Sequence, residues 1–142
     1  MNFDEFTGEI QHRLELPGTG EAVRATRATL MALGQRIPEG NAEDLAASLP
    51  MEIKWYMTGA VQEHGQRFDW AEFVSKVSEV ETVDREEAAY HAQVVMDLVA
   101  SQVPASDLQQ LRDAGFADVR TLTADDPLGS STEFALATLT ED

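Results

Sequence analysis

The sequence predicts an all-α protein, in which two pseudo-repeated bundles of three to four helices pack into one domain. Apolar residues recur at helical spacing, and proline and glycine interrupt them where helices are expected to end. The pattern of the first half returns loosely in the second, about 65 residues later. Each copy has a long Ala-rich segment that stops at Ile37-Pro38 or Val103-Pro104, followed by an Asp-Leu pair, Asp44-Leu45 or Asp107-Leu108. Repeated units of this kind bury their apolar faces against each other.

The first pseudo-repeat is expected over residues 2–58 and contains four helical segments. Residues 3–15 form an amphipathic helix, which the turn at residues 17–20 ends. Thr19 can cap the next helix, which runs to Ile37. Asn41 is expected to cap a short third helix, and Pro50 to stand in the first turn of a fourth helix that contains Ile53, Trp55, Tyr56 and Met57.

The second pseudo-repeat is expected over residues 68–122, after a connection at residues 59–67. Asp69 with Glu72 resembles a capping box, and Asp84 with Glu87 repeats this start signal for a long helix over residues 85–103. Ser106 is expected to cap a short helix, and residues 116–122 to form a shortened fourth one. For the C-terminal tail, 124–142, the sequence leaves helix, strand and coil open. The whole chain, 1–142, is expected to form a single domain.

Charge is the second strong signal of the sequence. Asp and Glu number 26 against 10 Lys and Arg, which gives a net charge of −16, and Lys54 and Lys76 are the lysines. Such a charge destabilises a compact state by self-repulsion, whereas about 1 M salt shortens the Debye length to about 3 Å and removes most of that repulsion. We therefore expect a protein of a halophilic cytosol; an acidic protein of a low-salt cell is the alternative.

The same composition argues against several classes of protein. Without cysteine there is no disulfide, thiol nucleophile or thiolate metal site. No apolar run approaches the roughly 20 residues of a membrane span, and the N-terminus lacks the basic start of a secretory signal. We therefore expect a cytoplasmic protein without membrane contact. No basic stripe is available to neutralise phosphates, so no nucleic-acid binding is expected.

Residues 2–122 resemble a known family, most clearly in the first copy. The resemblance lies in Phe3-Asp4-Glu5-Phe6 and in the segments 21–30, 33–37 and 41–50. These segments are similar to the domain-of-unknown-function family 2267 of bacteria and archaea. The resemblance implies an all-helical protein with two tandem copies, and it implies no activity. The second copy departs from the pattern at Ala114-Gly115-Phe116, where the first copy has Leu49-Pro50.

Arg24 and Arg27 form one candidate contact site. They lie three residues apart on one helix, and arginine can bind a carboxylate through two parallel hydrogen bonds. The pair can bind an acidic ligand or a partner's carboxylates, but pairing with the chain's own carboxylates is the simpler expectation.

Trp55 and Tyr56 form the second candidate contact site. Trp55, Tyr56 and Met57 are consecutive, so a helix cannot direct all three into one core. The favoured expectation is that Trp55 packs against Trp70 between the repeats. The alternative is that Trp55 anchors a partner protein or a second copy of the chain.

Metal, phosphate and catalytic sites are disfavoured. Glu9 with His12, and Glu87 with His91, have the helical spacing of metal ligands, but nothing supplies further ligands, so exposed or helix-pairing histidines and no metal are expected. The glycines at 18 and 20 lack the strand and the lysine of a phosphate loop. No nucleophile has a recognisable base, so neither an enzyme nor a cofactor is expected.

The sequence favours a non-enzymatic interaction or scaffold module that binds a protein partner or associates with itself. The alternative is a small-ligand or metal-responsive helical protein with a site between the repeats. A cavity between the repeats lined by Arg24, Arg27 or His91 would favour the alternative, and a filled contact with an exposed apolar patch would favour the interaction module.

Overall fold

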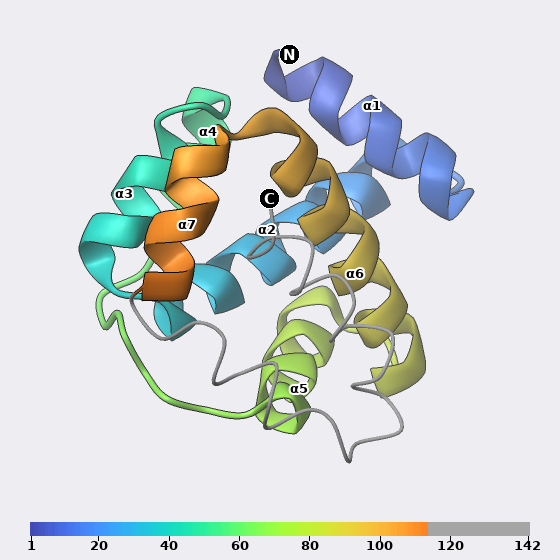
Figure 1. The fold of residues 1–142 in the computed structure, drawn as a ribbon. Helices are drawn as coiled ribbons and strands as arrows, with labels where there is room; N and C mark the ends of the chain where they lie inside the picture. Colours follow the sequence, from blue (N-terminus) through green and yellow to red (C-terminus); the bar gives the residue numbers. More distant parts are fainter. Residues whose placement is uncertain (114–142) are drawn as a thin grey trace.

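A computed structural model describes residues 1–113, and over this range the chain forms helices and no strand. The order is α1 (Phe3–Leu14), α2 (Thr19–Arg36), α3 (Glu39–Ala46), α4 (Met51–Met57), α5 (Trp70–Glu81), α6 (Arg85–Gln102) and α7 (Ala105–Asp113) (Figure 1). The predicted all-α class is confirmed. Within the described range, none of the helices is both long and apolar enough to cross a bilayer. The expected segment at 116–122 and the tail at 124–142 lie outside the described residues.

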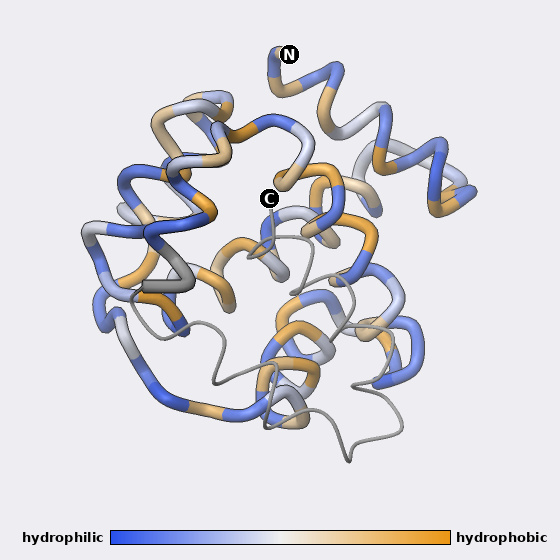
Figure 2. The backbone as a smooth tube through the Cα atoms, viewed as in Figure 1, coloured by the Kyte–Doolittle hydropathy of each residue, from blue (hydrophilic) through white to orange (hydrophobic). Residues whose placement is uncertain are grey.

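Helix α2 lies at the centre of the fold. It packs against α1, α3, α4, α5 and α6, while α1 and α5 each also contact α6. Helix α3 packs against α4 and α7, on the left of Figure 1. Figure 2 shows hydrophobic positions on the helix sides that face one another. The largest fully buried side chains come from both halves of the chain and include Phe6, Ile10, Leu30, Leu33, Trp70, Phe73 and Met96.

Side chains cap three of these helices at their N-termini. The Asn2 side chain accepts a hydrogen bond from the Glu5 backbone N–H at 2.8 Å, and the Glu5 carboxylate accepts one from the Asn2 N–H at 2.9 Å. This complete capping box at α1 was not predicted. The predicted caps of α5 and α6 are confirmed, since Asp69 and Asp84 accept the N–H groups three residues on, at 2.9 and 2.8 Å.

Other predicted helix starts are shifted along the chain. Gly18 occupies the N-cap of α2, and Thr19 is its first helical residue. Pro38 and Pro50 occupy the N-caps of α3 and α4 with φ of −59° and −55°, so Asn41 lies inside α3. Helix α7 begins at Ala105, which places Ser106 inside it. Proline fits an N-cap because its fixed φ suits the position and its missing N–H is not needed there.

Residues 58–69 join the two halves and follow the C-terminal end of α2. The N–H groups of Gly65 and Gln66 donate to the carbonyl oxygens of Ile37 and Gln35, at 2.9 and 2.8 Å. Nε of the buried Arg36 donates to the Phe68 carbonyl at 3.1 Å. These bonds give the last carbonyls of α2 partners and fix the connection against the helix.

Candidate functional site

An apolar groove of about 600 Å³ lies between α3 and α4. Its lining is Ala46, Ala47, Leu49, Met51, Lys54, Trp55 and Thr58. Met51 and Trp55 stand four residues apart on α4, so they share one side of the helix. Met51 is 82% exposed and Trp55 is 59% exposed. The groove therefore leaves two large apolar side chains in water, next to each other.

The favoured expectation for Trp55, burial between the two halves, is wrong. Trp70 is fully buried and stacks on Phe73, with ring centroids 5.1 Å apart and planes at 23°. On α4, Met57 points into the core, and Tyr56 makes an edge contact with Phe3 of α1 at 6.3 Å between centroids. Because consecutive helical side chains point about 100° apart, Trp55 is left on the solvent side.

Acidic side chains flank the groove on both helices. Glu43 lies one turn before Ala47 on α3, and Glu52 lies one turn before Trp55 on α4. Both carboxylates are exposed. Lys54, which lines the groove, is the cation closest to them in sequence on α4. The apolar centre of the groove thus has a predominantly anionic rim.

Arg24 and Arg27 are exposed on α2, one turn apart. Among the described residues, neither guanidinium makes a hydrogen bond or an ion pair. The described part of the chain therefore does not supply the internal carboxylate partners that were the simpler expectation. Burial raises the pKa of Tyr56, Arg27 opposes this rise, and Glu52 adds to it. Arg27 of α2 and Glu52 of α4 thus both act on Tyr56, whereas Trp55 lines the groove.

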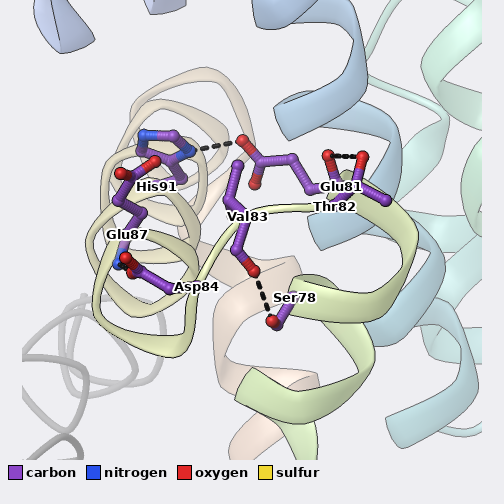
Figure 3. Close-up of polar contacts among 7 residues, drawn as sticks. All are labelled: Ser78, Glu81, Thr82, Val83, Asp84, Glu87 and His91. Carbon is purple, nitrogen blue, oxygen red and sulfur yellow. Dashed lines mark hydrogen bonds and ion pairs between the residues drawn. The ribbon is translucent and has the colours of Figure 1, made fainter.

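A buried polar pair at the corner between α5 and α6 was missed in the sequence (Figure 3). Nδ1 of His91 contacts Oε2 of Glu81, and the two residues are only 6% and 3% exposed. In the described structure, Oε1 of Glu81 has no hydrogen-bond partner. The burial of Glu81 could have been predicted from its position, because it follows the apolar Val77 by one turn on the buried side of α5.

This pair corrects the expectation for the histidines. His12 is exposed as expected, and the neighbouring Glu9 pairs with Arg13 at 2.8 Å. His91 is buried, and its partner is Glu81 from another helix, not Glu87 of its own helix. Local spacing suggested Glu87, but that residue is exposed, one turn nearer the helix start. Over residues 1–113, no group of three or more potential ligands is placed to hold a metal.

The corner itself is a tight turn held by side chains. Thr82 ends α5 in the left-handed region, with φ 60° and ψ 49°. The Ser78 hydroxyl donates to the Val83 carbonyl at 2.5 Å, and Asp84 then caps α6 (Figure 3). These contacts fix the start of α6 against the end of α5, which places His91 over Glu81.

A small hollow at the contact between the halves bears on the small-ligand alternative. It measures about 180 Å³, lies between α2 and α5, and is lined by Ala28, Met31, Ala32, Gln35, Lys76, Glu79 and Val80. Arg24, Arg27 and His91 do not line it, so it is not the cavity that the alternative requires. A wider, open hollow of about 790 Å³ lies along α1, and its described lining comes from α1 and the turn after it.

Comparison with known proteins identifies the family. No curated protein and no solved structure matches the chain. A family model matches residues 3–122 and is described as an uncharacterised conserved protein, DUF2267. The match spans most of the chain and includes every described helix. The chain therefore belongs to the DUF2267 family.

Proposed function

We propose that the protein is a non-enzymatic interaction module, and that the groove between α3 and α4 is its contact surface for an amphipathic helix of a partner protein. The observation that supports this proposal is the exposure of Met51 and Trp55, at 82% and 59%, side by side in one groove. Large aromatic side chains that become buried at the centre of an interface supply most of its binding energy. Trp55 is the side chain that serves as this anchor.

The rim of the groove defines the chemistry of the partner. The partner helix places an apolar side chain against Met51 and Trp55, and cationic side chains beside Glu43 and Glu52. Complementary charge at a rim selects the partner and its orientation more than it adds affinity. The apolar contact therefore supplies the affinity, and it persists in high salt, where the charged contacts are screened.

Capture from a high-salt lysate tests the role of the groove. The bait proteins are the wild type, the variant Met51→Ala/Trp55→Ala, and the control Tyr90→Ala, which removes a side chain that is 53% exposed on α6. We expect a protein that binds the wild type and the control but not the groove variant. A set of captured proteins that is the same for all three baits would contradict the proposal.

Tryptophan fluorescence then tests the nature of the partner. Synthetic helices with an apolar face and a cationic flank are titrated into the protein. Because Trp70 is already buried, a blue shift of emission reports burial of Trp55. We expect a shift that Trp55→Phe abolishes and that a helix with the same apolar face and an acidic flank produces less strongly. No shift with any amphipathic helix would exclude the groove as a helix-binding surface.

We further propose that α1–α4 and α5–α7 are pseudo-repeats. Helices α1 and α5 each have 12 residues, and α2 and α6 each have 18. Both short helices end in a left-handed residue, Glu15 or Thr82, and both long helices end in an extended residue, Ile37 or Val103. Helix α1 packs on α2 and α6 as α5 packs on α6 and α2. An experimental structure in which α1–α3 and α5–α7 cannot be superposed would contradict this proposal.

The working environment that we propose is a halophilic cytosol. The net charge of −16 and the presence of only two lysines support it. In molar salt the self-repulsion of such a surface is screened, and the protein stays hydrated and compact.

A further inference from the structure

We propose a second contact surface, at which Arg24 and Arg27 bind two carboxylates that stand one turn apart on a helix of a partner protein. This surface lies on the flank of α4 that carries Tyr56, so it is separate from the groove between α3 and α4. The inference does not rest on the function proposed for the groove.

The first observation is that these two arginines have no hydrogen-bond or ion-pair partner among residues 1–113, although the chain has 26 acidic residues. Four other described cations are engaged within the molecule, whereas Lys54 on α4 is exposed and has no described partner. Arg13 and Lys76 pair with carboxylates of their own helices, and Arg36 and Arg85 donate to backbone carbonyl oxygens. Arg24 and Arg27 have no hydrogen bond or ion pair among the described residues, although acidic side chains outnumber basic ones.

The nearest acidic residue on the same side of α2 points away from the pair. Glu21 precedes Arg24 by one turn, which is a favourable spacing for an ion pair. Its carboxylate instead lies against Gly18, because a Cβ atom at Gly18 would be 3.2 Å from Oε1 of Glu21. Two like charges one turn apart weaken a helix, and no described contact offsets this. A local charge conflict without internal compensation is characteristic of functional positions.

The surroundings of the pair suit a carboxylate ligand. Arg27 and Glu52 both act electrostatically on Tyr56, whose neutral hydroxyl can donate a hydrogen bond. Phe3 packs on the Tyr56 ring and holds it in place. The small neighbours Ala25 and Ala28 are buried, so no bulky side chain on α2 separates the two guanidinium groups.

Geometry favours two discrete carboxylates over a polyanion. The Cβ atoms of helical residues three or four apart are roughly 5–6 Å apart, so a pair of acids one turn apart on a partner helix matches the arginine pair. Each guanidinium then binds one carboxylate through two parallel hydrogen bonds. Two cations are too few for a nucleic-acid backbone, and a polyanion would be repelled by the net charge of −16. A largely neutral helix with a single acidic pair meets less repulsion.

Nuclear magnetic resonance titration tests the proposal. The probe is a neutral helical peptide with one Glu pair four residues apart, and the reference peptides carry Gln or Lys at those positions. The measurement follows the arginine Nε–Hε signals, in the lowest salt at which the protein keeps its native circular dichroism. We expect the Glu peptide to shift the signals of Arg24 and Arg27 and to bind at least about tenfold more tightly than the Gln peptide.

Charge-reversal variants provide the matched comparison. Arg24→Glu/Arg27→Glu is expected to lose binding of the Glu peptide and to bind the Lys peptide instead. Arg13→Glu/Lys76→Glu changes the net charge by the same amount at ion pairs elsewhere, and it should keep most of the binding. Equal losses in the two variants, or equal binding of the Glu and Gln peptides, would overturn the proposal.

Stability supplies an independent readout. Arg24→Gln/Arg27→Gln is expected to fold with an unchanged or raised Tm, because the described structure gives these side chains no internal partner. A Tm lowered by many degrees would mean that the pair stabilises the fold, and would overturn the proposal. Trp55→Ala should leave binding of the Glu peptide unchanged, so failure at the groove and failure at the arginine pair can be told apart.

Discussion

Breaking the buried Glu81–His91 pair is expected to destabilise the protein far more than replacing both residues. In the single variant His91→Leu, the Glu81 carboxylate stays 3% exposed and loses its partner at Oε2, while Oε1 already lacks one in the described structure. In the double variant Glu81→Leu/His91→Leu, neither position carries a polar side chain, and leucine fills much of the same volume. The two variants therefore separate the effect of an unsatisfied polar group from the effect of packing.

The expected magnitudes follow from the energetics of buried pairs. Removing one partner of a buried polar pair leaves the other group desolvated and unsatisfied, which lowers the free energy of unfolding by about 1–3 kcal/mol, and by about 3–5 kcal/mol where the remaining group is charged. Replacing both partners with apolar residues of similar volume is neutral or stabilising by about 1–4 kcal/mol. The single variant should therefore melt on the order of 10 °C lower, and the double variant at or above the wild-type Tm.

Urea denaturation at fixed molar KCl is the suitable assay. Urea is uncharged, so the screening of the acidic surface stays constant along the titration, which guanidinium chloride would not allow. The cycle contains the wild type, both single variants and the double variant, and circular dichroism follows the loss of helix. The matched control is Glu87→Leu, which removes an exposed acid four residues before His91 and should change stability by less than about 0.5 kcal/mol.

Two outcomes would refute this reasoning. If His91→Leu and Glu87→Leu lower stability equally, Glu81 does not depend on His91. If the double variant is as unstable as His91→Leu alone, the loss comes from packing, and the pair contributes through its shape and not through its polar contact.

Three further predictions concern packing, salt and pH. Gly34→Ala should lower the free energy of unfolding by about 1–3 kcal/mol, because the added Cβ would lie 2.4 Å from the Met57 carbonyl oxygen. The control Gly8→Ala, where the added Cβ would meet nothing within 4 Å, should raise the free energy of unfolding by up to about 1 kcal/mol. Urea denaturation measures both changes. Dialysis from molar KCl into dilute buffer should abolish most of the helical circular dichroism, and a native spectrum there would contradict a halophilic protein. Burial and the nearby Asp44 raise the pKa of Asp107 above its ordinary value of 3.8, so the charged carboxylate disfavours the folded state. Asp107→Asn should therefore raise Tm at pH 7, and this gain should disappear below pH 3.8, where the carboxyl is protonated in both states. A pH series of melting curves measures the difference.

Most of the helical architecture could be predicted because its signals are local. The long helices expected at 20–37 and 85–103 lie at Thr19–Arg36 and Arg85–Gln102. Apolar spacing marked their length, and the prolines at 38 and 104 marked their ends. The errors at Asn41 and Ser106 have one cause, which is a proline just before each helix. Pro38 occupies the N-cap of α3, where Asn41 was expected. Helix α7 begins at Ala105, directly after Pro104, and so includes Ser106, which was expected to cap it.

The polar contacts could not be predicted because they join residues from different helices. Local spacing suggested Glu87 as the partner of His91, but the packing of α5 on α6 brings Glu81 there instead. Composition suggested that Arg24 and Arg27 pair internally, but over residues 1–113 neither forms an ion pair with a carboxylate. The exposure of Trp55 could not be predicted either, because three consecutive large residues on a helix show only that at least one of them lies outside the core, and not which one.

The central position of α2 has a consequence for how the chain can be divided. A single cut within residues 59–67 would separate α2 from α5 and α6, which cover much of its surface. Each fragment would then expose a large apolar area and should fold poorly alone, yet the two should reassemble without a covalent link when mixed. The protein is therefore a natural candidate for a fragment-complementation pair, in which helical structure returns when the two fragments meet.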